Sequence, residues 1–127
     1  MPMPIETITT AALSAALETA SRRQAAVAAN IANASTPGYV PQRVSFDAHL
    51  AQARSALAER GALDAAAVDS LRAEAEPAFD ASGQAAVVQL DAEMSELARN
   101  GVEYQALVQG LSRHLGLLAL AAGDGRK

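Results

Sequence analysis

The sequence predicts an all-α protein, an elongated hairpin of two long helices at the ends of the chain with an irregular segment between them. Half of the 127 residues are hydrophobic but only 3% are aromatic, because alanine, which strongly favours helix, dominates the apolar share. Apolar residues recur at alternating spacings of four and three near both ends, the pattern of coiled-coil helices. A chain of this length forms one small domain, and small side chains bury little area, so we expect its stability to depend on partners.

The first helix is expected over residues 7–33, after a flexible start at 1–6, with Thr7 or Thr9 as its cap. At about 1.5 Å per residue it would be about 40 Å long. Gln24 is a polar residue in its apolar stripe, and a buried amide there would fix helix register at some cost in stability. The stripe consists of Leu13, Leu17, Ala20, Gln24, Val27, Ile31 and Ala34.

The helix is expected to end in a rigid corner, Thr36-Pro37-Gly38-Tyr39, which closes an N-terminal segment at residues 7–39. Pro37 biases the residue before it towards extended geometry. Gly38 supplies the positive φ that a type II turn requires at its third position.

Two asparagines, Asn30 and Asn33, stand about one helical turn before this corner. Their amides are placed either to bond the free carbonyls at the helix end or to reach a neighbouring subunit. Tyr39 has two equal alternatives, packing on its own helix or on another chain.

The middle segment, residues 40–86, carries weaker patterns. An alternating stretch at 40–46 predicts extended structure, which Pro41 confines to an edge or loop. Two shorter helices are expected, one from Phe46 that ends before Gly61 and a weaker one from Asp64 to Glu74. Turn residues then mark a loop at Pro77, Asp80, Ser82 and Gly83.

The C-terminal helix is expected over 87–122, followed by a frayed tail at 123–127. Gly101 keeps the phase of the apolar stripe, so the helix should continue through it and approach another helix closely there. The stripe consists of Leu90, Met94, Leu97, Gly101, Tyr104, Val108, Leu111, Leu115 and Leu118. Acidic residues near its start and basic residues near its end are expected to complement the helix dipole: Asp91, Glu93, Glu96, Arg113 and His114.

The sequence lacks the features that several functional classes require. The net charge of −4, whose excess lies between residues 47 and 80, argues against nucleic-acid binding. Without cysteine there is no thiolate chemistry, and no apolar run or basic leader indicates a membrane span or a secretory signal. The two histidines, His49 and His114, lack metal-site spacing, and the serines lack a nucleophile context. We therefore expect no cofactor, no metal and no enzymatic activity.

The segment Ala29-Asn30-Ile31-Ala32-Asn33-Ala34-Ser35-Thr36-Pro37-Gly38-Tyr39 resembles the signature of bacterial flagellar rod and hook proteins, commonly Ala-Asn-Asn-Ile-Ala-Asn-x-x-Thr-Pro-Gly-Tyr. Near the other end, Leu90-Asp91-Ala92-Glu93-Met94 and Tyr104-Gln105-Ala106-Leu107 are similar to proximal rod subunits of the B type. The chain departs from the pattern where Ile31 follows a single Asn, and at residues 85–89, where relatives have an Asn-rich turn.

The resemblance implies a structural subunit of the proximal rod in the flagellar basal body, which helps to transmit torque. It also implies export through the flagellar type III apparatus to the periplasm, and contacts with other rod subunits, copies of itself, the rod-base adaptor protein and the export gate. The alternatives are a C-type rod subunit and a cytoplasmic coiled-coil adaptor or export chaperone.

The expected assembly interface lies on both terminal helices and on the corner. It consists of Leu13, Leu17, Gln24, Val27, Asn30, Ile31, Asn33, Thr36, Pro37, Gly38, Tyr39, Leu90, Met94, Leu97, Asn100, Gly101, Tyr104, Val108, Leu111, Leu115 and Leu118.

Overall fold

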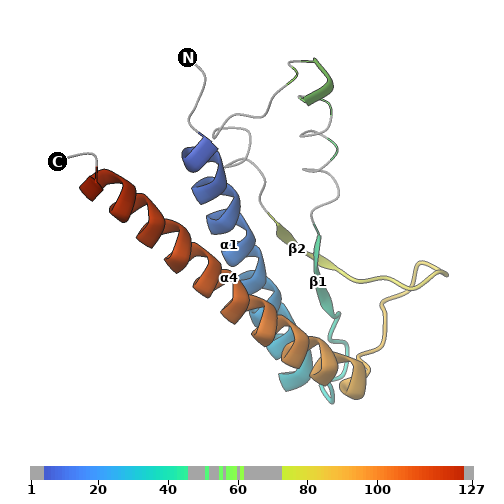
Figure 1. The fold of residues 1–127 in the computed structure, drawn as a ribbon. Coiled ribbons are helices and arrows are strands. Elements are labelled where there is room, and N and C mark those ends of the chain that lie inside the picture. Colours follow the sequence, from blue (N-terminus) through green and yellow to red (C-terminus); the bar gives the residue numbers. More distant parts are fainter. Residues whose placement is uncertain are drawn as a thin grey trace.

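Two long helices, α1 (Ile5–Ala32) and α4 (Leu90–Asp124), run antiparallel and side by side (Figure 1). The computed structural model describes residues 5–45, 51, 55, 57–59, 61 and 73–124. A two-stranded sheet of β1 (Gln42–Ser45) and β2 (Glu74–Pro77) packs on α1, which lies between α4 and the strands. The predicted helical hairpin is confirmed, with the small sheet as an addition to its middle segment.

The first helix begins at Ile5, earlier than the sequence pattern indicated. Thr7 and Thr9 therefore lie inside the first turns of α1, and the expectation that one of them caps the helix is wrong. A threonine can cap only from the position that precedes the first helical residue. The helix ends at Ala32, close to the expected boundary.

The corner after α1 has the predicted geometry. The Tyr39 amide donates to the Thr36 carbonyl oxygen at 3.3 Å, which closes a four-residue turn with Pro37 at its second position. Gly38 adopts a φ of 77°, the positive value that a type II turn requires.

The strand β1 confirms the extended pattern after Pro41, whereas the sequence did not predict β2. The two strands pair antiparallel from Gln42 opposite Pro77 to Ser45 opposite Glu74. Glu74 thus belongs to a strand and not to the end of a helix, as the sequence pattern had indicated. Alanine and glutamate favour helix, and a partner strand some thirty residues away overrides that local preference.

The short helix expected to end before Gly61 is described only in part, at residues 51, 55 and 57–59, which are helical. The Gly61 amide donates to the Leu57 carbonyl oxygen at 2.8 Å, and Gly61 has a φ of 72°. This is a helix end at the expected place. The rest of this helix, and residues 64–72 of the weaker one, lie outside the described residues.

The loop between β2 and α4 is ordered by Asp80. One carboxylate oxygen of Asp80 accepts hydrogen bonds from the Ser82 amide and hydroxyl and from the Gln84 amide. The Asp80 amide in turn donates to the Gln84 carbonyl oxygen at 2.7 Å, and Gly83 takes a φ of 84°. The predicted turn is therefore present, and it holds Phe79 with 62% of its surface exposed.

This turn should loosen in acid. The hydrogen bond from the Ser82 side chain, followed by that from the Gln84 amide, lowers the pKa of Asp80 below its ordinary value. A lowered folded-state pKa contributes stability above the unfolded value of about 4, which is lost as the pH falls through the folded pKa. We expect the protection of the Ser82 and Gln84 amides, relative to their intrinsic exchange rate at each pH, to fall below about pH 4, measured by NMR. An Asp80→Asn variant should lack this dependence, and an unchanged pH profile in that variant would contradict the assignment to Asp80.

The C-terminal helix is shifted along the chain relative to expectation: it begins later, at Leu90 instead of residue 87, and ends later, at Asp124 instead of residue 122. Gly123, expected in a frayed tail, is therefore helical. Arg113 and His114 lie well before the last turn, which has no basic residue, so the expected dipole complement at this end is wrong. Asp91 and Glu93 do occupy the first turn, as predicted.

Gly101 lies within continuous helix, as predicted, but no other part of the described chain approaches it closely. A Cβ atom built on Gly101 meets nothing within 4 Å, whereas one on Gly110 meets Leu13 at 4.0 Å. Among the described glycines of α4, Gly110 is the one whose Cβ position meets a side chain of α1.

The buried apolar core of the described chain consists of small side chains. Its members are Ala20, Ala26, Val27, Ala73 and Ala78. Because burial free energy scales with apolar area, at about 25 cal/mol per Å², this core supports the expectation that partners add to the stability of the fold. Among the described helices, none combines the length and the hydropathy of a membrane span.

Candidate assembly interface

The apolar stripe predicted on α1 lies largely against α4. Ala20 and Val27 are buried, and the neighbouring positions are half-buried. These are Leu13, Leu17, Gln24 and Ile31. Ala34 is exposed because it lies after the helix end. The α1 stripe is thus mostly occupied within the chain itself.

A pair of side-chain amides joins the two helices near their middle. Asn100, 1% exposed, donates from Nδ2 to the Ala20 carbonyl oxygen at 2.8 Å and to Gln24 Oε1 at 2.7 Å. The predicted polar contact of Gln24 is therefore made with α4. Because a buried amide pair is satisfied at one relative position only, we infer that it fixes the register of α1 against α4.

A second buried asparagine holds the corner. Asn30, also 1% exposed, accepts at Oδ1 from the Tyr39 hydroxyl and from the Gln42 amide, each at 2.9 Å. Its Nδ2 donates to the Gln42 carbonyl oxygen at 3.0 Å and to Glu93 Oε2 at 3.2 Å. One side chain thus joins α1, the corner, the first residue of β1 and the first turn of α4. We call Asn30, Tyr39, Gln42 and Glu93 the Asn30 clamp.

The Asn30 clamp bears on the roles expected for Asn30, Asn33 and Tyr39. Asn30 does not bond the free carbonyls at the end of its own helix. Its side-chain hydrogen bonds go to Tyr39, Gln42 and Glu93 of the same chain. Tyr39 packs back on its own helix through its hydroxyl group. Asn33 is the local cap, since it donates to the Ala29 carbonyl oxygen at 2.9 Å and accepts from the Thr36 hydroxyl at 3.2 Å.

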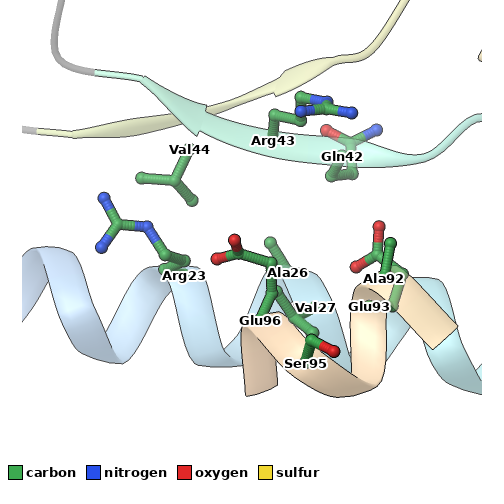
Figure 2. Close-up of a pocket in the computed structure, with 10 residues that line it drawn as sticks. All are labelled: Arg23, Ala26, Val27, Gln42, Arg43, Val44, Ala92, Glu93, Ser95 and Glu96. Atoms are coloured by element: carbon green, nitrogen blue, oxygen red, sulfur yellow. The ribbon is translucent and has the colours of Figure 1, made fainter. Parts of the chain in front are cut away.

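Beside the Asn30 clamp lies an open groove of about 470 Å³ between α1, β1 and the first turns of α4 (Figure 2). Its floor contains Ala26 and Val27, and the charged side chains of both signs stand around it. These are Arg23, Arg43, Glu93 and Glu96. Arg23 also forms an ion pair with Glu103 at 3.7 Å. The groove therefore has charged side chains of both signs around a small apolar floor.

The stripe predicted on α4 is half-buried at some positions and exposed at others. Leu97, Leu111 and Leu118 are half-buried, and Asn100 is buried and bonded to Ala20 and Gln24 of α1. The remaining large members are exposed: Leu90 52%, Met94 54%, Tyr104 41%, Val108 43% and Leu115 48%. α4 thus carries large apolar side chains that the described part of the chain leaves exposed.

Two half-buried residues of α4 were not among the expected interface positions. Leu107 and His114 follow Asn100 at intervals of seven, share its face and are half-buried. That interval was the signal that could have identified them. Gln42 and Glu93, the partners of Asn30, had no such signal because they are distant in sequence. Among the described residues, no three His, Asp or Glu side chains gather to hold a metal ion.

Comparison with known proteins agrees with this architecture. Residues 11–39, which include most of α1 and the corner, match the family model described as flagella basal body rod protein. The chain is 37% identical over 103 residues to the flagellar basal body rod protein FlgB of Bacillus subtilis (strain 168), covering 76% of this chain and 79% of that protein. The chain belongs to the flagellar basal-body rod protein family. It is accordingly a structural component of the flagellar basal body, and it acts in assembly with other rod components.

In this flagellar basal-body rod protein, part of the Asn30 clamp lies in the segment that matches the family model. Asn30, Pro37, Gly38 and Tyr39 lie within the matched residues. The Tyr39 hydroxyl bonds Asn30 Oδ1 across the turn that Pro37 and Gly38 form, and this arrangement directs the chain from α1 into β1. Membership of this family also favours the rod over a cytoplasmic adaptor or export chaperone.

Proposed function

We propose that this chain is a B-type subunit of the proximal rod, and that it acts as part of the rigid shaft that transmits torque. Its similarity to FlgB along most of both chains carries this proposal and favours the B type over the C type. The subunit reaches the periplasm through the flagellar type III apparatus, and it contacts other rod subunits, the rod-base adaptor protein and the export gate. It has no catalytic role.

The structure of the hairpin supports a load-bearing role. Two buried amide networks, around Asn30 and Asn100, lock α1 to the corner and to α4. Such networks tolerate little sliding because each hydrogen bond depends on its geometry. The small core and the exposed apolar side chains of α4 support the proposal that copies and relatives of the chain complete its packing.

The test is deletion of the gene in its own bacterium. We expect basal bodies without a rod, no secreted hook or filament protein and no swimming, each restored by the wild-type gene. Electron cryotomography of cells and immunoblots of the culture medium measure this outcome. In a cryo-EM map of basal bodies from the complemented strain, the chain should be traceable at the rod base. Complete rods in the deletion strain would contradict the proposal.

A further inference from the structure

Asn100 and Gly101 form a dipeptide with covalent chemistry of its own. Of the three asparagines in the chain, Asn30, Asn33 and Asn100, only Asn100 precedes a glycine. In a flexible chain, the backbone nitrogen of the following residue can attack the side-chain amide carbon of an asparagine. Glycine permits this ring closure best, because it has no Cβ atom to crowd the nitrogen and leaves the backbone free to rotate. The most reactive asparagine of the chain therefore lies inside α4.

The reaction of this dipeptide needs only water as a co-reactant. The Gly101 nitrogen forms a bond to Cγ of Asn100 while the bond from Cγ to Nδ2 breaks. Nδ2 leaves as ammonia, which carries away its own protons and the amide proton of Gly101. The product is a cyclic succinimide. Water then opens the ring at either of its carbonyl carbons, which leaves an aspartate or an isoaspartate in place of the asparagine.

The packed hairpin opposes each step of this reaction. Gly101 lies in continuous helix, where each amide bonds the carbonyl oxygen four residues before it, so its nitrogen is held in the helical ladder. The Asn100 side chain is buried, and its Nδ2 donates to the Ala20 carbonyl oxygen at 2.8 Å and to Gln24 Oε1 at 2.7 Å. Ring closure requires this side chain to rotate, which breaks both hydrogen bonds. Burial also keeps out the water that opens the ring.

We propose that Asn100-Gly101 is a deamidation site, which the packing of α1 on α4 protects in the folded chain and which reacts in the unfolded chain. When opening and closing are fast relative to a reaction of the open form, the rate of reaction follows the population of that form. About 1.4 kcal/mol of unfolding free energy therefore slows the conversion tenfold. Because this chemistry depends only on the sequence and the packing, it holds whatever partners the chain has.

Conversion of Asn100 removes the contact that fixes the register of the two helices. An aspartate carboxylate has no donor for the Ala20 carbonyl oxygen, so a buried charge would face an acceptor. An isoaspartate carries the main chain through its side-chain carbonyl group, which adds a methylene group to the backbone inside α4. Chains that remain unfolded therefore lose, in time, the ability to form the hairpin.

The test follows Asn100 in the purified full-length chain by peptide mapping with mass spectrometry, in mildly alkaline buffer. A series of guanidinium chloride concentrations unfolds the chain, and trimethylamine N-oxide extends the series towards the folded form. Circular dichroism measures the unfolded fraction of each sample. In full denaturant Asn100 should convert faster than Asn30 and Asn33, and along the series its rate should follow the unfolded fraction. Peptide mapping also separates Asn100 from Asp124, which precedes a glycine and can itself form a succinimide.

Gly101→Ala is the matched control for the reactivity of the dipeptide. A Cβ atom at Gly101 meets nothing within 4 Å, and alanine favours helix more than glycine does, so the variant keeps the fold. In denaturant, its Asn100 should convert only as fast as Asn33, which already precedes an alanine.

Gln24→Ala tests the protection by the packing. It removes one acceptor of Asn100 Nδ2, so it should raise the unfolded fraction and the conversion rate in native buffer by the same factor. Gln109→Ala makes the same change at an exposed residue of α4 and should alter neither quantity.

Each part of the proposal has a result that would overturn it. Equal rates at Asn100 and Asn33 in denatured wild-type chain would show that Gly101 confers no reactivity. A rate in the folded chain equal to that in denaturant would show that the packing gives no protection. Converted chain, separated by ion exchange because it carries an added negative charge, should recover less helical signal than wild type after the denaturant is removed. Full recovery would show that the packing does not depend on the Asn100 amide.

Discussion

Asn30→Asp should unfold the corner and abolish rod assembly, although the two side chains have almost the same shape. The change replaces the Nδ2 donor by a carboxylate oxygen, which then faces the Gln42 carbonyl oxygen and the Glu93 carboxylate. Two hydrogen bonds are lost and two acceptors confront a buried charge. We expect the free energy of unfolding to fall by about 3 kcal/mol, measured by urea denaturation followed by circular dichroism, together with loss of swimming.

Asn33→Asp is the matched control for this experiment. It makes the same chemical change about one turn further along, at a half-buried side chain whose bonds go to Ala29 and Thr36. We expect a cost of about 1 kcal/mol or less, because water can satisfy the groups that are released. If both variants lost the same stability, the effect would come from negative charge near the helix end, and the Asn30 clamp would not be its cause.

Gly38→Val should block assembly far more than Gly38→Asn. Because a Cβ atom at this position meets nothing within 4 Å while φ is 77°, the cost is one of backbone conformation and not of steric overlap with neighbours. A β-branched residue is strained in this region by about 2 kcal/mol, whereas asparagine tolerates it. Swimming at equal expression and urea denaturation of the purified variants measure the difference.

The same substitution at Gly116 separates backbone strain from side-chain bulk. Gly116 also has open space around its Cβ position, but it lies inside α4 without a positive φ. Gly116→Val should therefore leave the free energy of unfolding nearly unchanged or raise it, since glycine is the poorer helix former. Equal swimming by Gly38→Val and Gly38→Asn would show that the turn geometry is not needed for assembly.

Local features of the sequence were sufficient to predict the two long helices and the corner. The α1 stripe and the continuous course of α4 through Gly101 follow from apolar spacing alone, and the type II turn follows from Pro37 and Gly38. These elements depend on residues within one or two helical turns of each other. Their helix ends were less accurate, because capping and fraying depend on small energy differences.

The tertiary structure decided which surfaces are used. The strand β2 forms in a helix-favouring sequence because β1 supplies its partner across a long connection. Asn30 reads in sequence as a helix-end residue, yet its partners Gln42 and Glu93 lie 12 and 63 residues away. The α4 stripe likewise looked like one surface, whereas of its large apolar side chains Leu97, Leu111 and Leu118 are half-buried and the others are exposed. Apolar periodicity shows that a face must be buried, but it carries no information on what buries it, since the hydrophobic effect is non-directional.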